Sequence, residues 1–354
     1  MKTYNERRKE KKLIRIGNLT IGGKNDIAIQ SMTNTDTRDF KTTIEQIKSL
    51  ESEGCDIVRI SVFDEQCLDS ISEIKKSVKI PLVADIHYDY HLAIESIKRG
   101  IDKIRINPGN IGGYDKVKKI TECANEYQIP IRVGVNTGSL PKELYDIYNG
   151  PTSQAVLHAV KDQVKMLNDL NFDNIVIAAK SSNAMETVDI YRLLNDSFDY
   201  PLHVGVTEAG TLLNGTIKSS VALSILLEEG ISDTIRVSLT DDPVKEVIVA
   251  KNILSYMEIK KFGINIISCP TCGRTKIDII KIANIVQEKT KHINKNLNVA
   301  IMGCAVNGVN EARYADIGIA GGDKKAVIFK KGEILKTVSE DTVIEELIAE
   351  IEKC

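Results

Sequence analysis

The sequence predicts an eight-stranded βα-barrel followed by a smaller α+β domain, and three observations support this prediction. The chain has 354 residues, which is long for one hydrophobic core and suits two domains. Through its first two thirds, short β-branched runs alternate with longer amphipathic segments. Near Lys260 this alternation ends, and a Cys-x-x-Cys motif follows. We therefore expect a barrel domain at residues 1–258 and a second, compact domain at residues 262–354.

Eight strand-like runs alternate with helix-period segments in the first domain. A (β/α)₈ barrel takes about 250 residues, which matches this stretch. Glycine ends several of the helical segments, as it does at Gly54, Gly100 and Gly230. An open doubly wound sheet would alternate in the same way, but no Gly-x-Gly-x-x-Gly follows the first strand, which weakens a dinucleotide-binding fold. The expected strands are Ile27–Ser31, Asp56–Ser61, Leu82–Asp85, Lys103–Asn107, Ile131–Val135, Asn174–Ala178, Leu202–Val206 and Thr234–Ser238.

The second domain has a different order of elements, in which strands and helices do not alternate regularly. Its last helix has an apolar stripe formed by Val343, Leu347, Ile348 and Ile351. This mixture predicts a small α+β fold. The expected elements are a strand at Ile264–Ser268, a helix from near Thr275 to about His292, a strand at Asn298–Met302, a hairpin at 326–338 and a last helix capped by Ser339.

Composition and charge exclude several classes of protein. Apolar residues make up 42% of the chain, and the net charge is −2, so no global field favours nucleic acid. The basic opening, Lys2 to Arg15, is interrupted by Glu6 and Glu10 and is interpreted as a solvated arm. No apolar stretch follows it as in a signal peptide, and no run approaches the ~18 apolar residues of a membrane span. We expect a cytoplasmic protein that binds neither membranes nor nucleic acid.

Four expected strands carry an arginine near their C-terminal ends: Arg59, Arg105, Arg132 and Arg236. A guanidinium inside a barrel costs several kcal/mol unless it is paired. One explanation is that each arginine forms an ion pair with a structural carboxylate. Four arginines in the same position favour a shared anionic ligand at the barrel mouth, where barrel enzymes keep their active sites. The planar fork of arginine suits phosphate.

Further polar side chains are expected at the same end of the barrel. Side chains alternate along a strand, so Asn107 shares a face with Arg105, and Asn136 shares a face with Arg132. Lys180 ends the sixth strand and adds a fifth cation. We predict ligand contacts for these residues and for His203, which lies within the seventh strand.

Three titratable residues near strand ends are candidates for proton transfer. Asp85 and His87 follow the third strand, and Glu208 follows the seventh. A carboxyl group beside a ligand can act as a general acid once its pKa is raised. Each of these residues, like His203, also suits a cap or a core hydrogen bond.

The seven cysteines form no disulfide framework, and three of them suggest a metal site. Cys269 and Cys272 form the Cys-x-x-Cys, and Cys304 follows just after a strand. Zinc, a thioredoxin-like pair and an iron–sulfur cluster remain open on this spacing. His292 would complete a Cys₃His zinc site, whereas three thiolates suit a cubane cluster with one distinct iron. The cysteines in the barrel, Cys55, Cys67 and Cys123, are interpreted as ordinary buried residues.

Several motifs occur together, in an order and spacing that are highly specific. They are Gln30-Ser31-Met32-Thr33-Asn34-Thr35, Ala84-Asp85-Ile86-His87, Arg105-Ile106-Asn107-Pro108-Gly109-Asn110, Arg132-Val133-Gly134-Val135-Asn136, His203-Val204-Gly205-Val206-Thr207-Glu208-Ala209-Gly210 and Ser268-Cys269-Pro270-Thr271-Cys272-Gly273-Arg274-Thr275. With these motifs, nearly the whole chain resembles the short bacterial form of the 4-hydroxy-3-methylbut-2-enyl diphosphate synthase family, of the methylerythritol phosphate route to isoprenoids.

The resemblance implies a TIM barrel followed by a [4Fe–4S] domain, with cluster ligands at Cys269, Cys272, Cys304 and Glu311. It implies reductive ring opening and dehydroxylation of 2-C-methyl-D-erythritol 2,4-cyclodiphosphate to 4-hydroxy-3-methylbut-2-enyl diphosphate. Flavodoxin or ferredoxin would supply the electrons to a homodimer. The family's diphosphate-binding residues fall on Arg59, Arg105, Arg132, Asn136 and Lys180, with His87 nearby, and its proposed proton donor falls on Glu208.

The chain departs from the family pattern at one place, and two other functions remain as alternatives. Where the family reads Asn-Gly-Pro-Gly-Glu, this chain reads Asn307-Gly308-Val309-Asn310-Glu311. Asparagine tolerates the left-handed backbone, so we expect the loop to keep its shape. The first alternative is a barrel enzyme for another phosphorylated or pterin ligand, with a structural metal domain. The second is an iron–sulfur sensor without catalysis.

Overall fold

The computed structural model describes residues 3–304 and 308–354, in two compact units. The first unit is Met1–Lys260 and the second is Lys261–Cys354. None of the helices in the described part of the chain is both long enough and apolar enough to cross a membrane.

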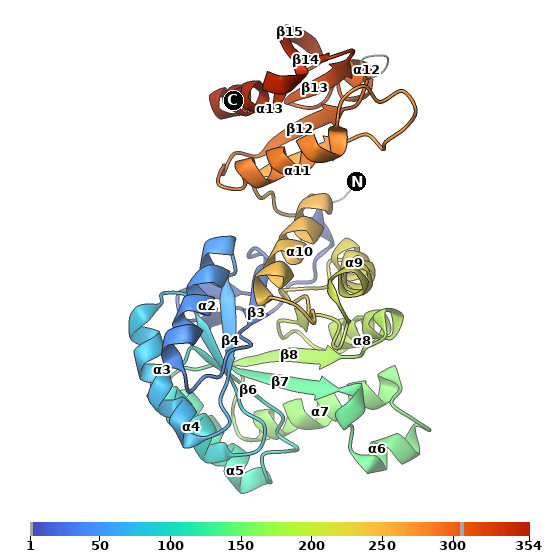
Figure 1. Ribbon diagram of the computed structural model, residues 1–354. Helices are drawn as coiled ribbons and strands as arrows, with labels where there is room; N and C mark the ends of the chain where they lie inside the picture. The colour runs from blue at the N-terminus through green and yellow to red at the C-terminus, as the bar shows by residue number, and fades with distance from the viewer. Residues whose placement is uncertain (1–2, 305–307) are drawn as a thin grey trace. The chain divides into compact units, whose positions relative to one another are not determined.

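The first unit is a parallel eight-stranded barrel, which confirms the predicted fold class (Figure 1). The strands follow the order β8-β7-β6-β5-β4-β3-β10-β9, and a parallel bridge between Ile177 and Leu202 joins the two ends of this series. β9 and β10 are shorter than expected, because their regular ladder ends where Gly205 lies against the carbonyl of Arg236. The strands are β3 (Ala28–Met32), β4 (Ile57–Ser61), β5 (Leu82–Asp85), β6 (Lys103–Ile106), β7 (Ile131–Asn136), β8 (Ile175–Lys180), β9 (His203–Val204) and β10 (Thr234–Ile235).

Helices surround the strands (Figure 1). Many of these helices begin at a side-chain cap. Asp39 and Asp64 each accept a hydrogen bond from a backbone amide in the first turn of the following helix, as an N-cap residue does. The helices of this unit are α1 (Tyr4–Arg7), α2 (Phe40–Glu53), α3 (Glu65–Ser77), α4 (Tyr90–Lys98), α5 (Tyr114–Glu126), η1 (Thr137–Ser139), α6 (Lys142–Ile147), α7 (Ser153–Asp169), α8 (Ala184–Ser197), α9 (Leu212–Glu228) and α10 (Pro243–Tyr256).

A short hairpin closes the N-terminal end of the barrel and corrects one prediction. β1 (Ile14–Ile16) pairs antiparallel with β2 (Leu19–Ile21), and their buried isoleucines pack on interior residues such as Ala28. Arg8 is buried and ion-paired with buried Asp233. The interpretation of this opening segment as a solvated arm was therefore wrong for Arg8 and Lys11, which are buried, whereas Lys9, Lys12 and Arg15 are exposed. Lys2 lies outside the described residues.

The second unit contains a mixed five-stranded sheet in the order β11-β12-β13-β14-β15. β11, β12 and β13 are parallel, and β13, β14 and β15 are antiparallel. The helix expected from near Thr275 begins at Ile279, because Asp278 accepts a hydrogen bond from the Lys281 amide and caps it there. The elements are β11 (Ile264–Ser268), α11 (Ile279–Thr290), β12 (Leu297–Met302), α12 (Gly308–Glu311), β13 (Ile317–Gly322), β14 (Lys325–Lys330), β15 (Glu333–Ser339), η2 (Glu340–Thr342) and α13 (Val343–Lys353).

Candidate active site

A polar cavity of about 240 Å³ lies at the C-terminal ends of the barrel strands. This is the end where barrel enzymes bind their substrates. Five of the described lining residues carry a guanidinium or an amine, and one carries a carboxylate. The lining residues are Arg59, Asp85, His87, Arg105, Arg132, Gly134, Asn136, Ala178, Lys180, Thr207, Arg236 and Ser238.

Strand alternation explains why the cations meet in this cavity. In a barrel, every second side chain of a strand points inward. Arg105 on β6 pairs in register with Arg132 on β7, so the two guanidiniums start from neighbouring positions. Asn136 on β7 is likewise in register with Lys180 on β8, four residues beyond Arg132 and so closer to the mouth. The same face therefore carries all of these groups.

Asp85 is the counter-ion at the centre of the cluster. Its carboxylate oxygens lie 3.3 Å from Nη1 of Arg105, 3.9 Å from Nε of Arg59 and 3.3 Å from Nε2 of His87. Burial would raise the pKa of Asp85, but Arg59, the hydrogen bond with His87 and Arg105 together hold that pKa well below its usual range. Asp85 is therefore ionised, and its place in the structure is that of an anion that orients the cations.

Arg236 is held by a second buried carboxylate. Glu246 on α10 lies with Oε2 3.3 Å from Nε of Arg236 and Oε1 3.4 Å from its Nη2. Glu246 also accepts hydrogen bonds from the Ser31 hydroxyl at 2.8 Å and from the Leu239 amide at 3.0 Å. Its side chain is only 4% exposed. Four donor atoms hold it in place. Sequence reasoning missed Glu246, because nothing in the helix α10 pattern marks it as facing the barrel.

The remaining cations lack enough negative partners in the described chain. Burial lowers the pKa of Lys180 and of Arg132 well below their usual values, and neighbouring arginines lower both further. Burial lowers the pKa of Arg59 to about 10. Within the described residues, Nε and Nη1 of Arg132 and Nε of Arg105 have no hydrogen-bond partner. Buried donors without partners are costly, so the cavity is built for an anion.

Gly134 provides space for one of these guanidiniums. A Cβ at this position would lie 2.8 Å from Nε of Arg105, which is closer than real side chains approach. Because Gly134 has no side chain, Arg105 on β6 can extend across the neighbouring strand β7. Gly134, Ala178, Thr207 and Ser238 line the cavity but were not predicted as site residues. Such small residues give no signal in the sequence that marks them as part of a site.

Three predicted site residues do not line this cavity. Asn107 is buried and accepts hydrogen bonds from Gln163 and from the Gly109 amide. His203 is fully buried, and its Nδ1 lies 2.7 Å from the Thr234 hydroxyl. Glu208 is exposed and directly follows Thr207, which does line the cavity. Its φ of 51° is unusual for a non-glycine residue.

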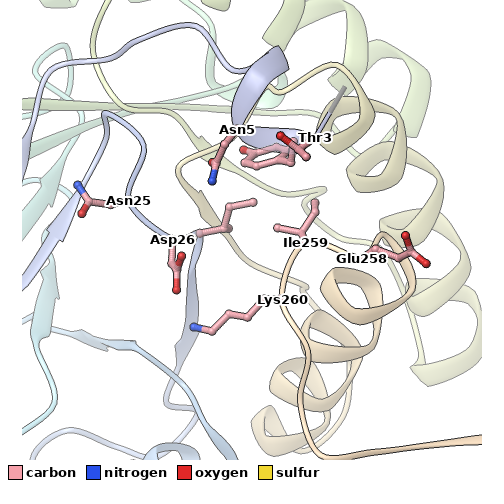
Figure 2. A pocket seen from close by; sticks show the side chains of 9 residues that line it. Thr3, Asn5, Asn25, Asp26, Glu258, Ile259 and Lys260 are labelled. Carbon is pink, nitrogen blue, oxygen red and sulfur yellow. The ribbon is translucent and has the colours of Figure 1, made fainter. Parts of the chain in front are cut away.

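A second cavity, of about 110 Å³, lies at the opposite, N-terminal end of the strands. Figure 2 shows its side chains, which come from the N-terminal residues, the turn before β3 and the loop after α10. Its charged residues, Asp26, Glu258 and Lys260, are of mixed sign. The cavity at the C-terminal strand ends gathers side chains of mostly positive charge, which favours it as the active site.

Cys269, Cys272 and Cys304 lie in loops that follow β11 and β12 of the second unit. Ser268 on β11 is in register with Ile301 on β12, so Cys269 and Cys304 both follow the C-terminal ends of adjacent parallel strands. The Gly303 amide donates a hydrogen bond to Sγ of Cys269 at 3.2 Å. Cys272 lies in the exposed loop that follows Cys269. Its pKa is lowered, first by hydrogen bonds from the Arg274 backbone and side chain.

Glu311, the fourth predicted ligand, is the last residue of the one-turn helix α12 and is exposed. Asn310 lies inside this turn and has no positive φ, so the left-handed backbone that we expected it to tolerate is not used. Asn307 lies outside the described residues. Within residues 3–304 and 308–354, no three His, Cys, Asp or Glu side chains are close enough together to hold a metal ion.

Comparison with known families gives a consistent answer for both units. Residues 11–251 match the GcpE TIM-barrel domain, and residues 265–353 match the GcpE protein C-terminal domain. This chain belongs to the GcpE family. The family resemblance noted in the sequence is thereby confirmed.

Relatives of this GcpE chain are similar over nearly their whole length. A protein of Caldanaerobacter subterraneus subsp. tengcongensis is 58% identical over 98% of this chain and 98% of its own. A protein of Ruminiclostridium cellulolyticum is 54% identical, again over 98% of each chain. Both relatives are named 4-hydroxy-3-methylbut-2-en-1-yl diphosphate synthase (flavodoxin).

Solved structures of other enzymes share the barrel of this GcpE chain. Dihydropteroate synthase of Xanthomonas albilineans aligns with a TM-score of 0.50 at 9% identity, over 70% of this chain and 98% of its own. N-acetylneuraminic acid synthetase of Leptospira borgpetersenii aligns with a TM-score of 0.50 at 11% identity, over 70% and 90% of the two chains. At such low identity these likenesses show the fold alone.

The donor set of the GcpE C-terminal domain suits an iron–sulfur cluster. Cys269, Cys272 and Cys304 are free thiols that are at least partly exposed, and the lowered pKa of Cys272 makes the thiolate, the form in which cysteine binds metal, easier to reach. The barrel cysteines contrast with them. Burial raises the pKa of Cys55 to about 12 and also raises the pKa of Cys67. The barrel thiols are therefore structural, and Cys269, Cys272 and Cys304 are the thiols that fit a metal group.

Proposed function

We propose that this chain is an iron–sulfur oxidoreductase that opens the ring of 2-C-methyl-D-erythritol 2,4-cyclodiphosphate and removes its hydroxyl to give 4-hydroxy-3-methylbut-2-enyl diphosphate. The observation that carries the proposal is the cavity at the barrel mouth, with five buried or half-buried cations and one carboxylate. A diphosphate supplies the anionic oxygens that these donors lack. The names of the two relatives, which align over nearly the whole chain, agree with this activity.

The barrel unit is proposed to bind the diphosphate and stabilise charge as the ring opens. The diphosphate oxygens would accept hydrogen bonds from Arg59, Arg105 and Arg132. Asn136 and Lys180 on the neighbouring strands would donate further hydrogen bonds. Arg236, which Glu246 already orients, would close the same ring of donors. His203 and Asn107, which lie outside the cavity lining, would support the site from within the barrel.

The second unit is proposed to hold a [4Fe–4S] cluster through Cys269, Cys272, Cys304 and Glu311. When bound, the cluster would supply single electrons and one iron with an exchangeable position. The loops after β11 and β12 and the helix α12 carry these four donors. The hydrogen bond from the Gly303 amide to Cys269 would stabilise one thiolate, and the hydrogen bonds from Arg274 to Cys272 would stabilise another.

Proton transfer is proposed to fall to Glu208. The reaction must protonate the hydroxyl that leaves, and an exposed carboxyl group next to the cavity lining can do so. His87 is half-exposed at the mouth and hydrogen-bonded to Asp85, so its role is to hold the counter-ion and contact the ligand. Asp85, kept ionised by its neighbours, would position Arg59 and Arg105.

Flavodoxin is the proposed electron donor, since the names of both relatives include it, and ferredoxin is the alternative. We also propose a homodimer in the cytoplasm. Anaerobic purification followed by metal and sulfide analysis tests the cofactor. About four iron and four sulfide per chain are expected for a [4Fe–4S] cluster. Zinc without sulfide would favour instead a barrel enzyme with a structural metal domain.

A further inference from the structure

A layer of buried polar side chains lies beneath the cavity, and we call it the buried polar layer. Its residues are all 2% exposed or less, and they come from five strands of the barrel. An apolar base that includes Ile14, Ile16 and Ile21 closes the N-terminal end of the barrel. The buried polar layer consists of Gln30, Lys103, Arg132, His203 and Thr234.

Lys103 has no acidic partner in this layer. Its single described hydrogen bond, from Nζ to Oε1 of Gln30, is long at 3.4 Å. The charged groups that face it are cationic: Arg132 on β7, Arg59 on β4 and, when protonated, His203 on β9. Asp85, on β5, is occupied by Arg59 and Arg105. An ammonium here would be a buried cation among cations, which costs several kcal/mol.

The hydrogen-bonding groups of the layer can also accommodate an uncharged amine at Lys103. An ammonium has three donors and no acceptor, whereas a neutral amine has a lone pair that can accept. In the described residues, Nε2 of Gln30 and Nε2 of His203 have no partner. Turning the Gln30 amide over would let its NH₂ group donate to the lone pair of Lys103, and the present orientation suits the protonated amine. The Gln30 amide can therefore partner both protonation states.

We propose that Lys103 belongs to the diphosphate site as a positioning residue, which is an uncharged amine in the ligand-free protein and takes up one proton when a diphosphate binds above it. The proton comes from water or a buffer acid. It binds to the lone pair of Nζ, which then has three bonds to hydrogen and one to carbon. No other bond forms or breaks. The inference rests on the proposed function, which supplies the identity of the ligand.

Electrostatics gives the coupling between ligand and proton. Arg132 belongs both to the cavity lining and to the buried polar layer. Burial, and then the positive charges of Arg132 and Arg59, lower the pKa of Lys103. A diphosphate that compensates those arginines removes part of this repulsion, and it adds negative charge of its own. The negative charge of the bound diphosphate therefore makes protonation of Lys103 easier, and because binding takes up a proton, affinity increases as pH falls.

Calorimetry of ligand binding measures this proton directly. The holoenzyme, purified anaerobically, is titrated with inorganic diphosphate and with the cyclic diphosphate in buffers of different ionisation enthalpy at about pH 7.5. The dependence of heat on buffer gives the number of protons taken up. Wild type is expected to take up about one proton more than Lys103→Met, because protonation changes of the ligand itself are common to both and cancel. For each unit by which the pH is lowered, the Kd of wild type should decrease by a factor about ten times larger than the Kd of Lys103→Met does.

Three further variants identify the acceptor. Lys103→Gln, which keeps a polar side chain, serves if Lys103→Met does not fold. Lys98→Met removes a surface lysine from α4 and should bind and take up protons like wild type. His203→Gln removes the histidine of the layer and should keep the proton uptake. Loss of the uptake in His203→Gln, with retention in both Lys103 variants, would assign the proton to His203 and overturn the inference.

The outcomes also separate this inference from the proposed function. If neither diphosphate binds to the wild-type holoenzyme, the proposed ligand is wrong and both conclusions fall. If a diphosphate binds with the same proton uptake in wild type and in the Lys103 variants, the inference alone is overturned, and the diphosphate site stands.

Discussion

The carboxylate of Asp85 lies 3.3 Å from the guanidinium of Arg105, at the mouth of the barrel and with little access to solvent. The same carboxylate is 3.9 Å from Arg59, so one anion separates two cations that would otherwise repel each other. This arrangement explains how the free protein tolerates a cluster of positive charge. It also predicts how that cluster responds when the anion is removed.

Asp85→Asn should destabilise the protein and make it depend on an anion. The substitution keeps the shape of the side chain but leaves buried guanidiniums without their counter-ion, which costs about 3 kcal/mol. Inorganic diphosphate should restore part of this loss, and should raise the Tm of the variant more than that of wild type. Thermal unfolding with and without diphosphate measures both effects. Equal Tm values for the two proteins would show that Asp85 is not the counter-ion.

The stability deficit of Asp85→Asn should be nearly independent of pH in the neutral range. Because the folded-state pKa of Asp85 lies below its ordinary value of 3.8, its ionised form contributes stability at every pH above that value. That contribution is lost only as pH falls from about 3.8 through the folded-state pKa. Denaturant unfolding between about pH 5 and 8 should therefore give a constant difference from wild type. A difference that disappears near pH 6 would mean that the carboxyl group titrates there.

Glu246→Gln should weaken substrate binding more than it slows turnover. Glutamine can still accept from the Leu239 amide, but it no longer balances Arg236 or holds its fork. We expect KM to rise about tenfold with a smaller change in kcat, because the misplaced group binds the ligand in both ground and transition states. Lys245→Met, on the same helix α10, is the control, since Lys245 pairs with Asp241 near the helix start. A selective loss of kcat in Glu246→Gln would contradict the positioning role.

Cys304→Ser should lose the visible absorbance of the cluster and all turnover. A serine hydroxyl replaces the thiolate poorly as an iron ligand, so the cluster should not assemble or persist. Cys123→Ser is the matched control, because Cys123 is buried in barrel helix α5. It should keep iron, sulfide and activity. Full activity of Cys304→Ser would remove Cys304 from the ligand set.

Glu208→Gln should bind the cyclic diphosphate normally and turn it over slowly. Glutamine has the same shape and a similar backbone preference, so the residue can keep its φ of 51°, but it cannot give up a proton. A loss of about 100-fold or more in kcat is expected for a positioned general acid. Calorimetric Kd and steady-state kcat separate the two properties. Weaker binding with an unchanged kcat would exclude the proton-donor role.

The barrel could be predicted because the sequence repeats its signal eight times. Each β-branched run followed by a helix-period segment gives one βα unit, and parallel strands place Arg59, Arg105 and Arg132 at one end. The strand order and the position of the cavity follow from that topology. The resemblance of the motifs then identified the family, which local patterns alone do not.

Other features escaped sequence reasoning for physical reasons. The hairpin that carries Ile14 and Ile16 is too short to show a period, and β13 is rich in glycine and alanine, which are poor strand formers. Glu246 acts through a contact with Arg236, ten residues away along the chain, across a helix and a strand. Lys103 reads as an ordinary strand residue, and only the barrel interior shows that its amine meets no acidic partner among the described residues.

The most direct test of the central claim is turnover of the cyclic diphosphate by the anaerobically purified protein with a chemical reductant, followed by mass spectrometry of the products. The proposed function predicts 4-hydroxy-3-methylbut-2-enyl diphosphate, formed only with reductant, and no product from Cys304→Ser. An intact cyclic diphosphate after incubation with a protein that holds its full complement of iron and sulfide would contradict it.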